Sequence, residues 1–360
     1  MHKALGRTKI EPAILILFMA LGLLPMCGGT FVLISGARNS HREISSIHVS
    51  QLAGHAQATL SRYLQRMIVQ VATIGTVPAV RSAVLRSNPR KVTSEEEEIE
   101  SEWAKLDANK SVRLRDLLGN SVSRFLRDYT QIAPSFREII VTDLYGRVVA
   151  ATNKTSDYFQ ADERWWAYAY REGAGGHFLG DIYLDKSAGI YAIEIAEPIM
   201  DPTTNTAVGV VKGVLKAQEI FGLVNSVDVG RNGYAALMRG DGAVIVSHWA
   251  TVTNQEHFPH FEEIRAAATN KQSSVVVGEG RDRLFVGLPR SRLVETYPEL
   301  DWYLIAHEPY DDAFAGFAEL NKYYTYVILV SILGIGALSM FFSRILSRPV
   351  IETDPHLEKL

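Results

Sequence analysis

The chain has 360 residues, enough for one or two globular units with accessory segments. Hydrophobic residues make up 47% of it and charged residues 21%, which excludes a chain that is disordered throughout. With 37 Lys and Arg against 40 Asp and Glu, the net charge is −3, and a globally basic nucleic-acid binder is excluded. The single cysteine, Cys27, excludes an intrachain disulfide and a cysteine-based zinc site.

The first strongly apolar segment, residues 13–35, carries no charge. A helix of roughly 20 apolar residues crosses the hydrocarbon core of a bilayer, so this segment predicts a first transmembrane helix. A cleaved signal peptide is the alternative, because Lys3, Arg7 and Lys9 precede the run. The length of the run and the lack of a small-residue cleavage site favour the anchor.

A second uncharged segment, residues 323–343, begins with three tyrosines and is followed by Arg344 and Arg348. Tyrosines favour the membrane–water interface, so this segment predicts a second transmembrane helix rather than a buried core helix. By the positive-inside rule, the basic flanks place residues 1–12 and 344–360 in the cytoplasm. Residues 36–322 are then expected outside the cytoplasm.

Residues 36–84 predict a long helix, with a break near Pro78. Apolar residues recur in it at spacings of three and four and form one stripe: Leu60, Tyr63, Leu64, Met67, Ile68 and Val71. The stripe has two interpretations, a contact with the core of its own domain or the seam of a parallel dimer, and both can hold along different parts of one long helix. Ser94 and Glu97 have the spacing of a capping box, which favours a solvated first helical turn over a metal site. A further helix is expected over residues 103–129.

Two runs of strands follow, each with Asp and Gly at its first turn. The first run comprises residues 138–143, 147–152, 190–196 and 207–215. The second run comprises residues 234–238, 243–247, 273–277, 283–287 and 302–307. This repeated order predicts tandem α+β modules.

The chain resembles the double Cache family of bacterial extracytoplasmic sensors over residues 36–317. The resemblance is carried by Thr-Asp-Leu-Tyr-Gly-Arg-Val-Val-Ala-Ala-Thr at 142–152, by residues 157–166, 180–189 and 197–211, and by Gly-Tyr at 233–234. It implies an α+β fold: a long N-terminal helix followed by two PAS-like antiparallel-sheet modules, flanked by two transmembrane helices. The membrane-distal module is expected over about 85–222 and the proximal module over about 223–318. In this family the distal module usually holds the ligand and the long first helix pairs two protomers.

Amino-acid-binding members of the family resemble Tyr-x4-Arg-x-Trp-Tyr-x2-Ala, followed by Tyr-x-Asp and a later Asp. Tyr158 matches the first tyrosine, and Trp165 and Trp166 match the Trp-Tyr pair. Tyr183 and Asp185 match Tyr-x-Asp.

The charged anchors of the motif are changed. Glu163 stands where the family has the arginine that binds the ligand's carboxylate, with Arg164 one position on. The strand expected to carry the later Asp has Lys212 and Lys216 instead. Because a glutamate repels a carboxylate, ordinary α-amino acids are expected to bind poorly. A carboxylate ligand with Arg164 or a lysine, and a cation with Glu163 and Asp185, both remain open.

The predicted ligand site therefore consists of Tyr158, Glu163, Arg164, Trp165, Trp166, Tyr183, Asp185 and Lys212. A plainer interpretation places the two tryptophans in the core and makes Tyr183 and Asp185 a turn at a strand end. Asp143 and Gly146 are interpreted as turn residues only. His257 and His260, with His248, are a weak zinc motif without an obvious acidic ligand. We expect no metal, no cofactor and no catalytic residue.

These features predict a two-pass receptor of the bacterial inner membrane with a periplasmic or extracellular sensor region. It is expected to be a homodimer that binds a small molecule and signals to a cytoplasmic output domain or protein, as chemoreceptors and sensor histidine kinases do. Residues 347–350 resemble the opening of a HAMP relay. The alternatives are a membrane-anchored extracytoplasmic enzyme and a partner-docking ectodomain without a small ligand.

Overall fold

The computed structural model describes residues 12–89, 99–105, 111–185, 189–252, 256–289 and 293–346. The chain divides into two compact units, Ile47–Pro309 and a second unit made of Met1–Ser46 and Tyr310–Leu360. The predicted capping box at Ser94 and Glu97 and the HAMP-like segment lie outside the described residues.

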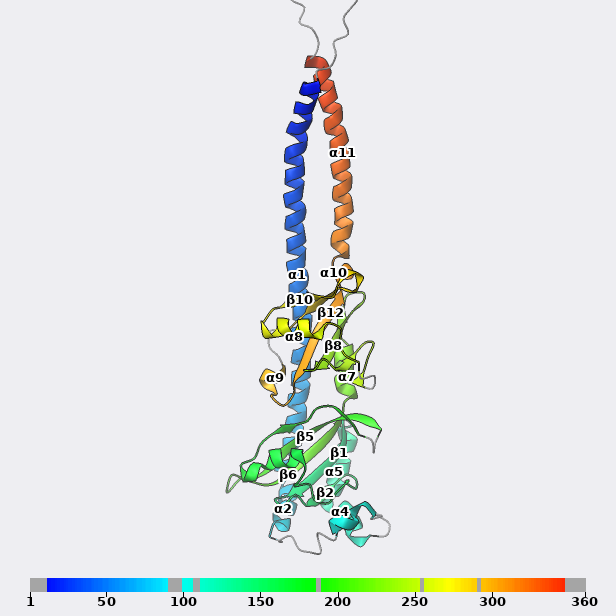
Figure 1. The fold of residues 1–360 in the computed structure, drawn as a ribbon. Coiled ribbons are helices and arrows are strands. Elements are labelled where there is room, and N and C mark those ends of the chain that lie inside the picture. Colours follow the sequence, from blue (N-terminus) through cyan, green and yellow to red (C-terminus); the bar gives the residue numbers. More distant parts are fainter. Residues whose placement is uncertain are drawn as a thin grey trace, which may run out of the picture. The chain divides into compact units, whose positions relative to one another are not determined.

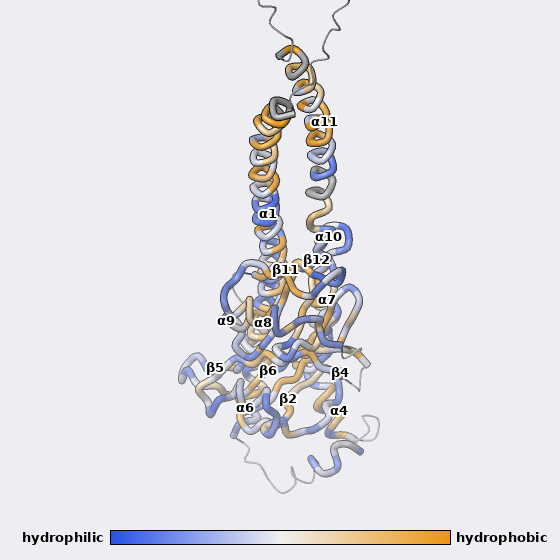
Figure 2. The backbone as a smooth tube through the Cα atoms, turned by 45° about the horizontal axis from the view of Figure 1, so that its top comes forward, coloured by the Kyte–Doolittle hydropathy of each residue, from blue (hydrophilic) through white to orange (hydrophobic). Residues whose placement is uncertain are grey.

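Both apolar segments lie in long helices. Helix α1 runs from Pro12 to Thr76, and α11 runs from Ala315 to Leu346 after the short α10 (Tyr310–Ala313). By length and composition, each contains a stretch able to cross a membrane, and Figure 2 shows the hydrophobic colouring of these stretches. Helix α1 continues without interruption past residue 35, so the expected end of the apolar segment is not the end of a helix.

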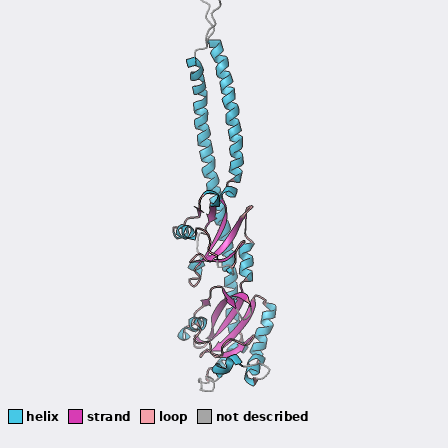
Figure 3. Cartoon of the chain, turned by 45° about the vertical axis from the view of Figure 1, so that its right-hand side comes forward, coloured by secondary structure: helices cyan, strands magenta, loops and turns pink. Residues whose placement is uncertain are grey.

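The unit Ile47–Pro309 contains two antiparallel sheets (Figures 1 and 3). The first module has the order β2-β1-β6-β5-β3, with β4 also paired to β5. Its strands are β1 (Phe136–Asp143), β2 (Val148–Ala151), β3 (Phe178–Leu179), β4 (Tyr183–Asp185), β5 (Ile190–Asp201) and β6 (Thr206–Lys216).

The second module has the order β10-β11-β12-β8-β7, with β9 also paired to β8. Its strands are β7 (Asp228–Val229), β8 (Gly233–Arg239), β9 (Val244–Ser247), β10 (Ser274–Val277), β11 (Leu284–Gly287) and β12 (Trp302–Pro309). The two predicted runs of strands are thus confirmed, and the repeated order does form two modules.

Short helices accompany the two sheets. They are α2 (Pro78–Ser87), α4 (Val112–Gly119), α5 (Ser121–Ile132) and α6 (Arg164–Tyr170) in the first module, and α7 (Gln218–Asn225), α8 (Phe261–Thr269) and α9 (Leu293–Thr296) in the second. The predicted break near Pro78 is confirmed, because α1 ends at Thr76 and Val77 is extended.

The prediction of one helix over residues 103–129 is wrong. The described part of this region is a 3₁₀ turn (Trp103–Lys105), followed by α4 and α5. Asn120 separates α4 from α5 with an extended backbone, and its side chain accepts a hydrogen bond of 2.8 Å from the Ser123 amide. An asparagine in this role starts a new helix, so the apolar periodicity continues across a real boundary.

The stripe on α1 belongs to the core of its own chain. Leu60, Leu64 and Val71 are fully buried, and Met67 is nearly so. They share one apolar cluster with side chains from alternate positions of the first sheet: Ile139, Val141, Ile193, Ile195, Val211 and Leu215. The core interpretation is therefore confirmed, and a dimer seam through these four residues is wrong, because no surface is left there for a second copy.

The second module packs on the same helix. Leu237 of β8, Ile245 of β9 and Leu304 of β12 belong to the cluster that contains the stripe. The Tyr297 hydroxyl donates to the carbonyl of Ser61 on α1 at 3.0 Å. Helix α1 is thus the common support of both modules within this unit (Figure 1).

Asp143 does more than form a turn, contrary to the sequence-based interpretation. Its Oδ1 accepts from the amides of Tyr145 and Arg147, and its Oδ2 accepts from Arg147 Nε at 2.7 Å and from the Ser87 hydroxyl at 2.7 Å. Arg147 in turn donates to the Ser87 carbonyl at the end of α2. The buried ion pair therefore ties the β1–β2 hairpin to α2.

Candidate functional site

A cavity of about 580 Å³ lies on the face of the first sheet opposite α1. Successive side chains on a strand point to opposite faces, so residues directly paired across strands share a face. Glu138 and Glu194 are both paired with Val214, and Ile140 is paired with Lys212. These five residues line the cavity, together with residues from the segment 154–163 and from β4.

The structure brings together half of the predicted site residues. Glu163, Tyr183, Asp185 and Lys212 line this cavity. Trp165 lies against it: its ring centroid is 4.8 Å from Lys212 Nζ, an arrangement in which the ring face attracts the ammonium group.

The other three predicted residues are not in its lining. Tyr158 packs its ring against Trp103 at 5.3 Å. Arg164 is exposed, with its guanidinium 5.9 Å from the ring of Tyr168. Trp166 is buried and donates from Nε1 to the Thr142 hydroxyl at 2.9 Å, so it serves the core between α6 and the sheet.

Lys212 is the central cation of the cavity, and it is 8% exposed. Its Nζ lies 2.6 Å from Glu194 Oε1, which also accepts a hydrogen bond of 2.9 Å from the Tyr183 hydroxyl. A buried charge needs such a partner, because desolvation is otherwise costly. Lys212 is therefore engaged within the protein.

Carboxylates outnumber cations in the lining. Glu138, Glu163, Asp185 and Glu194 are acidic, whereas the basic residues are Lys154 and Lys212. Burial raises the pKa of Glu138, and Asp185 and Glu194 add to the rise while Lys212 opposes it. Burial also raises the pKa of Glu163, which Lys212 again opposes. The cavity thus has an excess of negative charge that an added cation would relieve.

Sequence reasoning missed Lys154, Glu138 and Glu194. Glu194 had a usable signal, because it lies between Ile193 and Ile195 in an apolar stretch of β5, whereas Glu138 follows Arg137 near the start of β1 and does not stand out. Lys154 lies in a connecting segment, where neither periodicity nor a motif singles it out.

The histidines of the weak zinc motif have other roles. His260 lies immediately before α8 with Nδ1 3.1 Å from Glu263 Oε1, and His257 forms an isolated bridge with Ala243. Within the described residues, no group of three or more His, Cys, Asp or Glu side chains is placed to hold a metal ion.

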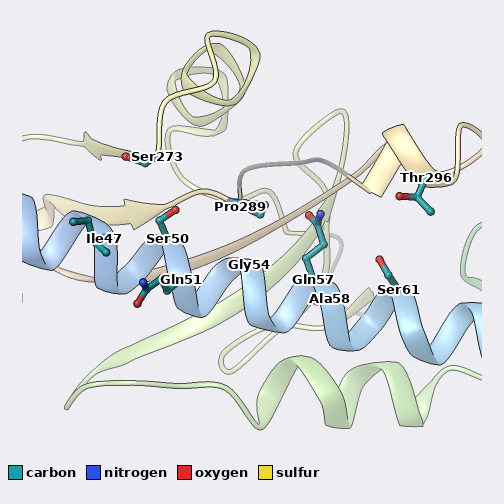
Figure 4. A pocket seen from close by; sticks show the side chains of 10 residues that line it. All are labelled: Ile47, Ser50, Gln51, Gly54, Gln57, Ala58, Ser61, Ser273, Pro289 and Thr296. Atoms are coloured by element: carbon teal, nitrogen blue, oxygen red, sulfur yellow. The ribbon is translucent and has the colours of Figure 1, made fainter.

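A further cavity, of about 620 Å³, lies between α1 and the second module (Figure 4). Figure 4 shows small and polar residues of α1 along it, among them Ser50, Gly54 and Ser61. None of its described lining residues is charged, so it offers no group that would select an ionic ligand.

No protein-family model matches the chain. Two curated proteins are similar to it, both methyl-accepting chemotaxis proteins. McpA of Pseudomonas putida is 25% identical over 190 residues, which is 52% of this chain and 28% of McpA. PctB of Pseudomonas aeruginosa is 25% identical over 200 residues, which is 55% of this chain and 30% of PctB. The chain thus spans less than a third of the length of these relatives.

Among solved structures, the sensory domain of the Campylobacter jejuni chemoreceptor Tlp3 (CcmL), with isoleucine bound, aligns with 76% of this chain and 96% of its own. The TM-score is 0.51 at 14% identity, so the likeness is one of fold. Two antiparallel sheets supported by one long helix, together with this likeness, show that the chain has the fold of such sensory domains, the double Cache type. The resemblance expected from the sequence is confirmed, as is the α+β fold.

Proposed function

We propose that this chain is the sensory and membrane-anchoring region of a two-pass receptor, and that the cavity on the first sheet is its ligand site. The observation that carries the proposal is a buried lysine in a lining that is mostly acidic: Lys212 pairs with Glu194, which also accepts from Tyr183, and the partly or fully exposed Glu138 and Glu163 lie beside them. Buried polar groups are costly to maintain unless they are satisfied or used, and a concave site with a few convergent polar groups is typical of ligand recognition.

The ligand that fits this lining best is a small cation without a carboxylate. The four acidic residues of the described lining favour an ammonium group. A carboxylate fits the described lining less well: Arg164 is outside it, Lys212 is paired with Glu194, and Lys154, its other basic residue, stands against four acidic residues. This supports the expectation that ordinary α-amino acids bind poorly, although the Tlp3 sensory domain has been solved with isoleucine.

Signalling follows from the connectivity of the chain. Strand β12 ends at Pro309, and only the short α10 separates it from α11, which is apolar enough to cross a membrane. A ligand that binds one conformation of the sensory region more tightly increases the population of that conformation, and α11 transmits the change to the domain or protein connected to it. We propose a cytoplasmic output domain or protein as the receiver, with residues 36–322 outside the cytoplasm and both termini inside.

We also propose a homodimer. Since the stripe of α1 is used by the core, pairing along this helix must use its exposed face. Exposed residues recur there at spacings of three and four: Ile44, His48, Gln51, His55, Ala58 and Arg62.

The test of the ligand site uses the full chain in lipid nanodiscs and a thermal-shift screen of amines, α-amino acids and carboxylates. A ligand selective for the folded state raises the melting temperature. We expect stabilisation by amines and little by the other two classes. For an amine hit, Glu163→Gln and Asp185→Asn should each weaken binding by about tenfold or more, because each removes a charge from the site.

Glu262→Gln is the matched control, since Glu262 lies exposed on α8 in the second module. Stabilisation by α-amino acids or carboxylates instead of amines would contradict the ligand class. An amine affinity unchanged in both cavity variants would contradict the site.

A further inference from the structure

Glu197 is an acidic residue in an apolar setting on the other face of the first sheet. Glu197 lies on β5 between Ile195 and Ile199 at alternate positions, and both isoleucines belong to the cluster that packs on α1. Glu197 is 1% exposed. It faces away from the cavity that contains Glu194, so it is not part of the site described above.

The carboxylate of Glu197 is only half satisfied. His177 Nδ1 lies 2.5 Å from Oε2, and a proton on that nitrogen is donated to the carboxylate. Oε1 is buried and has no hydrogen-bond partner within the described part of the chain. Burial raises the pKa of the carboxyl to about 7, with the nearby His177 acting in the opposite direction. A buried acceptor without a donor is an unstable arrangement that a hydrogen-bond donor would complete.

Glu197 lines a cavity of about 300 Å³ to which both modules contribute. Apolar walls come from Ile68 of α1 and Leu179 of β3 in the first module, and from Pro298 ahead of β12 in the second. Glu197 and Glu299 are its acidic residues, and its described lining contains no Lys or Arg. This size is at the lower end of the range for small-molecule pockets.

The cavity adjoins a larger hollow. His177 and Glu299 also line a space of about 980 Å³ beside the turn after α6. The His177 side chain is 75% exposed, so it lies between solvent and the buried carboxylate. A small molecule entering from the hollow would meet Glu299 first and Glu197 at the inner end.

We propose that the cavity at Glu197 is a second ligand site, which takes a small primary ammonium compound with an apolar body. The ammonium group donates to Glu197 Oε1, and Glu299 supplies a second negative charge near the entrance. The apolar body packs against Ile68, Leu179 and Pro298. Because the walls come from both modules, occupancy holds the modules in one arrangement, independently of the cavity on the other face of the sheet.

The test compares benzylamine with benzyl alcohol, which has nearly the same shape but no charge. Each is titrated by calorimetry into the full chain in lipid nanodiscs at about pH 8, above the pKa of Glu197, so that the carboxylate is ionised. We expect binding of the amine and no measurable binding of the alcohol. Glu197→Gln should weaken amine binding by at least about tenfold, and Glu299→Gln by less, because Glu299 is more exposed.

Glu262→Gln, on the exposed surface of α8, is the matched control, and Asp185→Asn reports whether the amine binds in the cavity on the opposite face instead. Glu299 is exposed, so Glu299→Gln tests the site even if Glu197→Gln fails to fold. Equal binding of the alcohol would overturn the ligand class. Amine binding that is absent, that is unaffected by both glutamate variants, or that is lost only in Asp185→Asn would overturn the site. The last outcome would leave the function proposed above intact.

Discussion

At the scale of single residues, buried charges define both the framework and the candidate sites. Asp143 and Arg147 are buried in the first module and satisfy each other and the end of α2. Lys212 and Glu194 also pair with each other, and they lie in the lining of a cavity. The difference is that the first pair is enclosed by structure, whereas the second faces space that a ligand can enter.

The Asp143–Arg147 pair is expected to be a strong determinant of stability. Asp143→Ala removes the carboxylate that pairs with the buried guanidinium of Arg147, whose other contacts include the Ser87 carbonyl and the Tyr145 ring, and should lower the free energy of unfolding by about 3–5 kcal/mol. Urea unfolding followed by circular dichroism measures this. The double variant Asp143→Leu/Arg147→Met should lose less than Asp143→Ala, because no charge is then left buried. A loss below about 1 kcal/mol for Asp143→Ala would show that water reaches Arg147.

His307 on β12 predicts a dependence of stability on pH. It is 6% exposed, neither ring nitrogen has a hydrogen-bond partner within the described residues, and its neighbour Phe258 lies 5.1 Å away between ring centroids. Burial lowers its pKa from 6.5 to about 4. Between pH 6.5 and about pH 4, His307 is protonated in the unfolded chain but not in the folded chain. The free energy of unfolding therefore decreases as the pH falls through this range.

The loss attributable to His307 is at most about 3 kcal/mol between pH 7 and pH 4. His307→Phe removes the proton site and suits the aromatic surroundings, so the variant should gain stability relative to the parent as the pH is lowered. Unfolding of both proteins at several pH values isolates this residue, since more distant groups cancel in the difference. A constant difference between the two proteins from pH 7 to pH 4 would contradict the neutral state of His307.

At the scale of elements, α1 does two things at once. One face carries the core stripe, and the opposite face stays exposed through Gln51, Ala58 and Arg62. Apolar periodicity alone identifies the first face and says nothing of which surface it meets. The element also joins the apolar N-terminal stretch to both modules in one unbroken helix.

Disulfide crosslinking in membranes distinguishes the two faces of α1. In a Cys27→Ser background, Gln51→Cys and Ala58→Cys should crosslink to their twins in a second copy. Leu64→Cys should not, because Leu64 is fully buried in its own chain. Crosslinking at position 64 but not at 51 or 58 would mean that the copies associate through an opened core, and no crosslinking at any of these positions would exclude pairing along this part of α1.

At the scale of the whole molecule, the proposal requires the sensor unit and the termini to lie on opposite sides of a membrane. The two apolar stretches in α1 and α11 and their basic flanks motivate it. In the Cys27→Ser background, Ile132→Cys offers a label site that is 84% exposed on the sensor unit. An impermeant maleimide should label it in intact spheroplasts, whereas His2→Cys should be labelled only after lysis. If position 132 is labelled only after lysis, the proposed membrane topology is wrong.

The sequence by itself determined the two apolar stretches, the break near Pro78 and the strands of both modules, because these depend on local periodicity and turn residues. The sensor-type fold followed from the resemblance to the double Cache family. It did not determine the boundary at Asn120, where a side-chain cap interrupts a continuous apolar pattern. Only the tertiary structure decided that the apolar stripe of α1 packs into the core of its own chain, because a stripe looks the same whether it meets a sheet or a second helix. Tertiary structure also decided how the site residues are distributed. Glu194 and Glu197 are three positions apart on one strand, and the two-residue period of the strand sends them to opposite faces and so into different cavities.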